Sequence, residues 1–163
     1  MELLLFVDAA TGKSIGGQGV VVKSEDPTGI YFELRLPLHA RMNQIRAELT
    51  AVWSGLNLIP DVLSSFKVRP KDVYVHIYSD ATAAVEALYK PDTQTNKKVR
   101  LLIKRIWRVV NFEIGQPKGG GCTFHTITRK KKEGDKARTL ELRKYMNRAH
   151  ELSRKARAAF KDV

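Results

Sequence analysis

Cysteine is almost missing from this sequence, because Cys122 is its one thiol among 163 residues. A single cysteine excludes an internal disulfide framework and a cysteine-rich zinc site, and it fits a reducing compartment. The chain also lacks an apolar run long enough to cross a bilayer, and its first residues do not resemble a signal peptide. We therefore expect a cytoplasmic protein with no membrane partner. The length predicts one domain over residues 1–163.

Acidic residues are also scarce, with 17 Asp and Glu against 29 Lys and Arg, so the net charge is +12. A folded domain with this charge most often binds a polyanion, usually nucleic acid. A merely basic surface is the alternative, but the bases are concentrated in the run 129–132 and on one face of an expected helix at 96–110. We predict that these segments hold phosphates without reading sequence. The predicted residues are Lys97, Lys98, Lys104, Arg105, Arg129, Lys130, Lys131 and Lys132.

The spacing of apolar residues predicts three strands joined by short turns, then further strands separated by helices. Residues 3–7 form an unbroken apolar run, which is typical of a strand covered on both faces. Helical spacing starts at Ile45 with Asn43 as the cap, and Pro37 and Pro60 are expected to end the elements before them. The expected strands are 3–7, 20–23, 30–36, 73–79 and 122–128, and the expected helices are 45–59, 81–89, 96–110 and 137–160. This order predicts an α/β fold whose five-stranded mixed sheet combines an antiparallel meander with parallel strands and carries helices on both faces.

Two of the expected strands lead into an aspartate, Asp8 and Asp80, and Glu48 lies in the first turns of the helix between them. Alone, an aspartate at a strand end more often starts a turn. If the fourth strand lies parallel beside the first, however, both aspartates meet at the carboxyl edge of the sheet, where open α/β sheets place their sites. Three carboxylates in one small site repel each other and lose hydration. Hard divalent cations relieve this, and two Mg²⁺ or Mn²⁺ ions about 4 Å apart can support phosphodiester hydrolysis.

These residues resemble ribonuclease HI. The resemblance rests on Asp8 after the first strand, the helix 43–52 that carries Glu48, and the run 77–80 that ends in Asp80. It extends over almost the whole chain in element order and spacing. It implies the ribonuclease H-like three-layer fold and an endonuclease that hydrolyses the RNA strand of RNA–DNA hybrids with two metal ions. It also implies that Asp8 bridges both ions, with Glu48 and Asp80 completing the site.

The last helix departs from the family pattern. The family carries its fourth acid in a pattern like Asn-x-x-Ala-Asp-x-Leu, whereas residues 147–152 of this chain place His150 at that position. A neutral imidazole can also bind a divalent ion, so we count His150 as the fourth catalytic and metal-binding residue. A lost ligand is the alternative, since Glu151 lies about 100° further around the helix and is a poor substitute. The basic segment 130–146 before this motif is a second departure.

The predicted function is therefore that of a monomeric ribonuclease H, a hydrolase that binds RNA–DNA hybrids. Two alternatives stay open. One is a noncatalytic ribonuclease H-like module that binds nucleic acid and has lost its fourth ligand, and the other is a different nuclease of the superfamily, such as a junction resolvase. The presence of Asp8, Glu48 and Asp80 argues against the first, and the position of Glu48 on the first helix argues against the second.

The remaining histidines and the early glycines receive structural interpretations. His125 could be the mobile histidine of the family that helps product release, but it lies in an expected strand, so a structural role is favoured. His39 and His76 have no evident companions and are interpreted as structural or surface residues. Gly16, Gly17 and Gly19 are expected to form a turn, where they would also let a nucleic-acid backbone approach closely.

Overall fold

The computed structural model describes residues 1–163 apart from 14, 26–28, 40, 115–120 and 161–163. Its strands are β1 (Glu2–Ala10), β2 (Gly16–Ser24), β3 (Tyr31–Leu38), β4 (Tyr74–Ser79) and β5 (Gly121–Thr126). Its α-helices are α1 (Gln44–Ser65), α2 (Thr82–Tyr89), α3 (Lys97–Val109) and α4 (Ala137–Phe160). Short helical turns at Pro70–Asp72, Pro91–Thr93 and Val110–Ile114 follow α1, α2 and α3.

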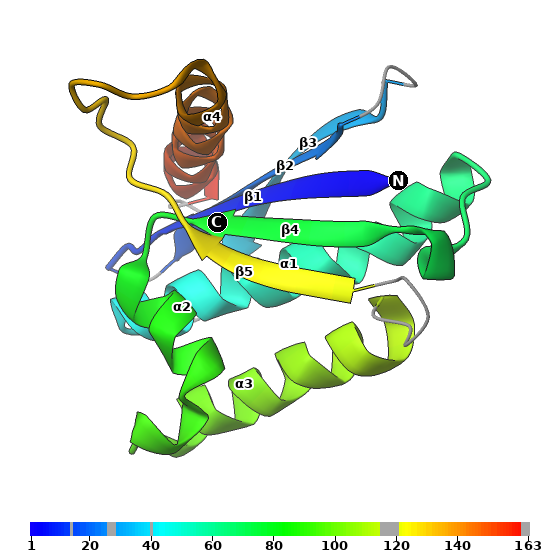
Figure 1. The fold of residues 1–163 in the computed structure, drawn as a ribbon. Helices are drawn as coiled ribbons and strands as arrows, with labels where there is room; N and C mark the ends of the chain where they lie inside the picture. Colours follow the sequence, from blue (N-terminus) through cyan, green and yellow to red (C-terminus); the bar gives the residue numbers. More distant parts are fainter. Residues whose placement is uncertain (14, 26–28, 40, 115–120, 161–163) are drawn as a thin grey trace.

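The five strands form one sheet in the order β3-β2-β1-β4-β5. The first three strands pair antiparallel, whereas β4 lies parallel to β1, and β5 lies parallel to β4. Figure 1 shows α4 on one face of the sheet and α1, α2 and α3 on the other, which gives three layers. The fold class predicted from the sequence is therefore confirmed. Among the described residues, no helix has the length and apolar character needed to span a membrane.

Strand β1 lies in the centre of the sheet and is buried on both faces. Leu5 and Val7 pack with the helices of the α1 layer, while Leu4 and Phe6 pack with α4. Successive side chains of a strand point to opposite faces, so an apolar layer on each side requires an unbroken apolar run. The same alternation points Asp8 toward α4.

The glycines at the start of β2 are strand residues, although the sequence predicts a turn there. β2 begins at Gly16, and a Cβ atom at Gly17 or Gly19 would collide with the backbone of α4 near Ser153. The interpretation of these two glycines as an approach site for nucleic acid was therefore wrong. Their missing side chains instead let α4 lie directly against β2, which brings the helix within reach of Asp8.

Both prolines that were expected to end an element lie inside one. β3 continues through Pro37 to Leu38 because it is an edge strand, where a residue without an N–H group can face away from the ladder. α1 continues through Pro60 to Ser65. A proline inside a helix costs about 3 kcal/mol. The burial of Ile59 and Leu63 on either side of Pro60 offsets this cost.

Candidate active site

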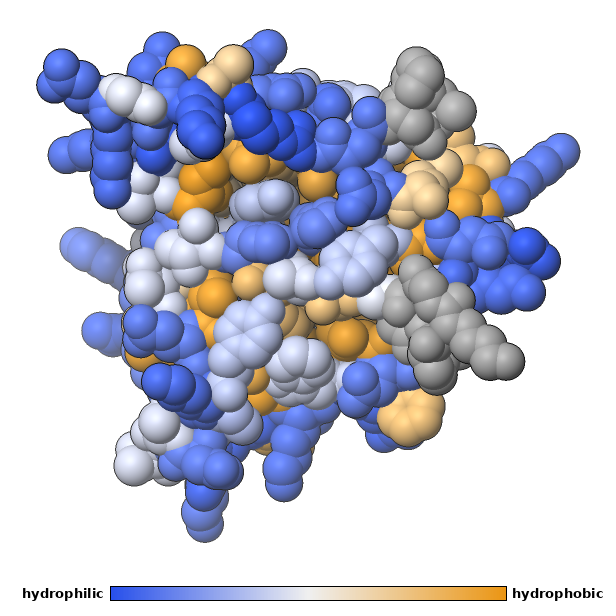
Figure 2. Space-filling view, viewed as in Figure 1, coloured by the Kyte–Doolittle hydropathy of each residue, from blue (hydrophilic) through white to orange (hydrophobic). Residues whose placement is uncertain are grey.

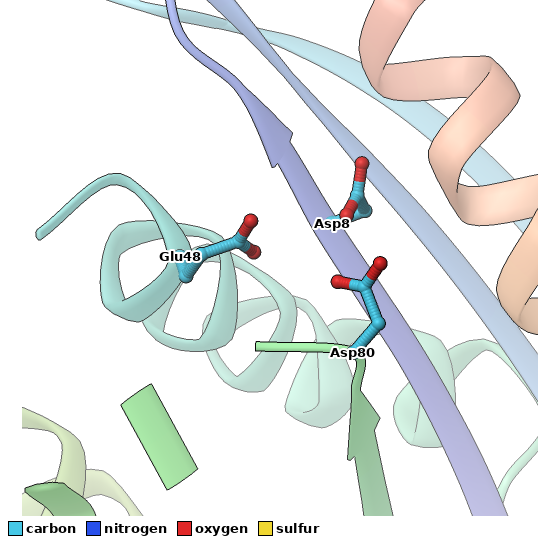
Figure 3. Close-up of side chains that lie close together, drawn as sticks. All are labelled: Asp8, Glu48 and Asp80. Carbon is cyan, nitrogen blue, oxygen red and sulfur yellow. The ribbon is translucent and has the colours of Figure 1, made fainter. Parts of the chain in front are cut away.

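Asp8, Glu48 and Asp80 come together at the end of the sheet toward which β1 and β4 both run (Figure 3). One oxygen atom of each carboxylate lies within 4.8 Å of the other two. The parallel register produces this meeting, because Phe6 pairs with Tyr78 and the two aspartates follow two residues later on each chain segment. This convergence was predicted from the sequence, and the structure contains it.

Glu48 reaches the cluster from the second turn of α1. This helix starts after Asn43, whose side chain accepts a hydrogen bond of 2.9 Å from the Arg46 N–H group, as a helix cap does. Gln44 lies one turn before Glu48 and donates from Nε2 to Glu48 Oε1 at 2.7 Å. The other oxygen, Oε2, is buried and has no hydrogen-bond partner among the described residues. A buried oxygen of this kind is costly, and a cation between the three acids would satisfy it.

Asp8 is held by two side chains of α4. β1 does not end at Asp8 but continues to Ala10, so the carboxylate projects from the side of the strand. Ser153 Oγ donates to Asp8 Oδ2 at 2.5 Å, and His150 Nδ1 lies 3.0 Å from the same oxygen. His150 therefore lies beside the three acids. Ser153 was not predicted as a site residue, although its position three residues after His150 puts it on the same helix face.

Arg129 provides the partner of Asp80. Its Nε atom donates to Asp80 Oδ2 at 2.7 Å, and its side chain stays 38% exposed. The segment that carries Arg129 is fixed to the end of β4, because the Ile127 N–H group donates to the Ser79 carbonyl at 3.0 Å. Arg129 was predicted as a phosphate-binding residue of a charged loop. The structure adds a direct contact with one of the acids, which the sequence did not suggest.

Burial changes the proton affinity of the two innermost acids. It is the main cause that raises the pKa of Glu48 to about 9, and the nearby charges of Asp8 and Asp80 act in the same direction. Burial also raises the pKa of Asp8 to about 6, although the hydrogen bond from Ser153 opposes the change. Without a cation, the cluster therefore binds protons near neutral pH. A divalent ion would instead favour the ionised form of these carboxylates. Hard cations such as Mg²⁺ prefer oxygen ligands of this kind.

These shifts predict how stability depends on pH and metal. The ordinary pKa values of Glu48 and Asp8 are 4.5 and 3.8, and folding raises both. The folded chain therefore binds these protons more tightly than the unfolded chain. Their contribution to the free energy of unfolding is therefore fully present below about pH 4 and is lost as the pH rises through about 6 and 9. At pH 8, Mg²⁺ or Mn²⁺ at 100 times its Kd should raise Tm by about 5–10 °C.

Thermal melts at several pH values, with and without the cations, measure this effect. The control is the double variant Asp8→Asn/Glu48→Gln, in which the two titrating groups are removed. Its Tm should depend less on pH and should not rise with the cations. An equal rise in the wild type and the double variant would show that the ions bind elsewhere.

The other predicted phosphate-binding residues form two exposed groups. Lys97, Lys98, Lys104 and Arg105 project from α3, and two of them, Lys98 and Arg105, line a groove of about 380 Å³ beside α1. The segment 130–132 after β5 is exposed as well. Figure 2 shows hydrophilic side chains over α4 and the segment before it, and again along α3. The ion pairs of the acid cluster are with Arg129 and His150, and none of these lysines forms an ion pair with it among the described residues.

Comparison of the sequence with protein-family models and with curated proteins finds no match. Solved structures do match. Ribonuclease H1 from the halophilic archaeon Halobacterium salinarum shares 16% identity over 100% of both chains, with a TM-score of 0.67. The LC11 ribonuclease H1 isolated from compost, solved with an RNA/DNA hybrid, shares 16% identity over 96% of this chain and 97% of its own, with a TM-score of 0.65. The N-terminal ribonuclease H domain of a Mycobacterium tuberculosis protein shares 16% identity over 97% and 94%, with a TM-score of 0.63. The chain therefore has the ribonuclease H-like fold.

Proposed function

We propose that this chain is an endonuclease that hydrolyses the RNA strand of RNA–DNA hybrids with two divalent ions, Mg²⁺ or Mn²⁺. The observation that carries the proposal is the cluster of Asp8, Glu48 and Asp80, whose ligand oxygens lie within 4.8 Å of one another. The buried Oε2 atom of Glu48 supports it, because this oxygen has no hydrogen-bond partner among the described residues and a purely structural cluster would leave it unsatisfied.

Each residue of the cluster has a role in this proposal. Asp8, Glu48, Asp80 and His150 would hold the two ions, since Asp8 shares the cluster with Glu48 and Asp80 and also contacts His150. When bound, such ions activate a water molecule and stabilise the leaving oxygen of a phosphodiester. Ser153 donates a 2.5 Å hydrogen bond to Asp8, which orients this carboxylate as a metal ligand would need.

Arg129 and the exposed lysines would hold the substrate. Arg129 lies at the rim of the cluster, so its guanidinium can leave Asp80 for a phosphate when Asp80 binds metal. The four basic residues of α3 and the lysines at 130–132 would contact phosphates further from the cleaved bond. These contacts carry no sequence information, so we expect binding to depend on salt rather than on base sequence.

A noncatalytic module of the same fold is the second candidate, and the position of His150 is the feature that favours it. Its Nδ1 atom forms a hydrogen bond of 3.0 Å with Asp8. The same hydrogen bond would be expected if the imidazole had replaced the fourth acid of the family and bound no metal. The three acids argue for the enzyme, since burial of carboxylates that bind no metal is costly and serves no binding role.

Cleavage of a labelled RNA–DNA hybrid in the presence of Mg²⁺ or Mn²⁺ tests the proposal. Single-stranded RNA, duplex DNA and a four-way DNA junction serve as comparison substrates. We expect the RNA strand of the hybrid to be cut and the DNA strand to stay intact. Cutting of the junction alone would favour a resolvase, and binding without any cutting would favour the noncatalytic module.

The basic segment after β5 has its own prediction. Replacing Lys130, Lys131 and Lys132 with Ala should weaken hybrid binding equally for all sequences. The slope of log K against log salt should flatten by about 0.9 for each lost phosphate contact. Fluorescence anisotropy at four or more salt concentrations measures this slope. The matched control is Arg69→Ala/Lys71→Ala at the opposite end of β4, which should leave the slope unchanged. Equal slopes for wild type and triple variant would show that this segment does not contact the backbone.

A further inference from the structure

The outer edge of β3 has no strand beside it. β3 is the first strand in the sheet order, so β2 is its one neighbour among the described strands (Figure 1). The Ser24 N–H group donates to the Ile30 carbonyl at 3.0 Å, and hydrogen-bonded pairs alternate along an antiparallel ladder. The ladder to β2 therefore uses the backbone of every second residue of β3 from Phe32 on.

The residues between them turn their backbone groups outward. They are Tyr31, Glu33, Arg35 and Pro37. Pro37 fits this alternation, because a residue without an N–H group is tolerated where its nitrogen faces away from the ladder. A row of N–H and C=O groups that no strand pairs with is a template for a further strand.

The α4 face of β3 carries charges of both signs. Arg148 Nε donates to Glu33 Oε2 at 2.7 Å, and the Tyr31 hydroxyl donates to Glu33 Oε1 at 2.8 Å, so this carboxylate is held in place. Arg35 lies two residues further along the same face, is exposed and forms no ion pair among the described residues. An edge strand that carries an acid and a base in this way can attract a second copy of itself.

The opposite face of β3 is apolar and only partly covered. Phe32, Leu34 and Leu36 point to the α1 side, but α1 packs mainly against β1 and α3. Leu34 packs against the core, whereas Phe32 stays 39% exposed. A strand added at this edge would cover these side chains if it also turned apolar residues to the α1 side.

We propose that β3 pairs antiparallel with β3 of a second copy of this chain, with the two Leu34 residues opposite each other on a two-fold axis. An isologous interface of this kind uses the same surface on both copies. In this register Glu33 lies opposite Arg35 of the second copy, and the symmetry repeats the pair. On the other face, Phe32 lies opposite Leu36 of the second copy.

The backbone supports the same register. Glu33 exchanges two hydrogen bonds with Arg35 of the second copy, and the Tyr31 N–H group donates to the Pro37 carbonyl of the second copy. The residue without an N–H group therefore lies at the end of the pairing. The neighbouring registers are centred on Glu33 or on Arg35, and each would place like charges opposite each other.

β5 at the other edge of the sheet lacks this complementarity. Its residues 121–126 include no acidic residue. His125 Nε2 instead lies 2.9 Å from His76 Nδ1 on the neighbouring strand, so the interpretation of His76 as a residue without a companion was wrong. The pairing is therefore expected for β3 and not for β5.

This dimer is independent of the proposed nuclease function, because it depends on the strand edge and not on the three acids. The two-fold axis reverses the strands of the second copy, which places the two acid clusters at opposite ends of the combined sheet. One pair of strands is a small interface, so we expect association that depends on concentration. A monomer was expected from the sequence, and it is the alternative.

Sedimentation velocity of the full chain over a wide range of concentrations tests the proposal. The wild type should change from monomer to dimer as the concentration rises. Arg35→Glu places two acids opposite each other and should weaken association by at least about tenfold. Glu33→Arg places two bases opposite each other and should do the same. An equimolar mixture of the two variants should associate again, because one copy then supplies both acids and the other both bases.

The matched control is Arg100→Glu, which makes the same change of charge at an exposed residue of α3 and should dimerise like the wild type. Circular dichroism melts of all variants show whether they fold. A wild type that stays monomeric at every concentration would overturn the proposal and leave the edge to another partner or to none. A dimer of unchanged affinity in Arg35→Glu would also overturn it, as would a mixture of the two variants that does not associate.

A cysteine substitution tests the register independently. Residues opposite each other in a non-hydrogen-bonded antiparallel pair have Cα atoms about 4.5 Å apart, and a disulfide needs about 4.4–6.8 Å. In a Cys122→Ser background, Leu34→Cys should therefore form a disulfide-linked dimer under mild oxidation. Leu36→Cys should not, because its two copies lie about 14 Å apart at about 3.4 Å per residue. Equal yields from the two cysteine variants would contradict this register.

Discussion

Replacing Asp8 with Asn should reduce hydrolysis of the hybrid by about 10³-fold or more, which corresponds to at least about 4 kcal/mol of transition-state stabilisation. An amide binds hard cations more weakly than a carboxylate does, so under the two-metal proposal the ions would lose a ligand. Binding of the hybrid should stay unchanged or become tighter, because the variant removes one negative charge near the phosphates. Initial cleavage rates and anisotropy on the same samples measure the two quantities.

Asp61→Asn is the matched control for Asp8→Asn. Asp61 is an exposed acid of α1, so this variant makes the same change of charge outside the cluster and should cleave normally. Asp80→Asn should behave like Asp8→Asn. Normal cleavage by either cluster variant would contradict the two-metal proposal. Loss of binding together with loss of cleavage would indicate a folding defect instead.

Replacing His150 with Ala should remove most of the activity with either cation. His150 Nδ1 lies 3.0 Å from Asp8 Oδ2, so the ring can act as a metal ligand or as a donor that orients Asp8. Mg²⁺ tolerates nitrogen ligands poorly, while Mn²⁺ accepts both nitrogen and oxygen. We therefore expect the wild type to work better with Mn²⁺, and His150→Asp to shift the preference toward Mg²⁺. The ratio of the two rates at saturating metal measures this preference.

His150→Gln separates the two roles of the histidine. A glutamine amide can still donate a hydrogen bond to Asp8 but lacks the imidazole nitrogen. If His150 binds metal, this variant should lose activity as His150→Ala does. If His150 only orients Asp8, the glutamine should retain much of the activity. Full activity of His150→Ala with both cations would show that the site needs only its three acids.

The acid cluster was predictable because it follows from local patterns. The unbroken apolar run before Asp8 identifies a central strand, and a second strand leads into Asp80. A parallel neighbour then brings the two ends together without any knowledge of side-chain packing. Glu48 was predictable for a similar reason, since the helical spacing that starts at Ile45 fixes its place near the start of α1.

Whether the prolines end an element and whether the glycines form a turn was not predictable in the same way. Pro37 breaks a strand only where its missing N–H group is needed, and this depends on β3 being at the edge of the sheet. Pro60 is tolerated because Leu63 and its neighbours are buried. This burial depends on tertiary packing, so rules based on neighbouring residues do not predict it. Gly19 looked like a turn residue because the sequence does not indicate that α4 lies against it.

By itself, the sequence determined the order of the elements, the α/β fold class and the three acids, because each of these depends on residues close together in the chain. Only the tertiary structure decided which side chains support them. Ser153 and Asp8 are 145 residues apart, and Arg129 and Asp80 are 49 apart. Contacts over such separations exist only after the strands have paired and α4 has docked, so spacing can place Ser153 on the helix face of His150 but cannot give the partner that it contacts.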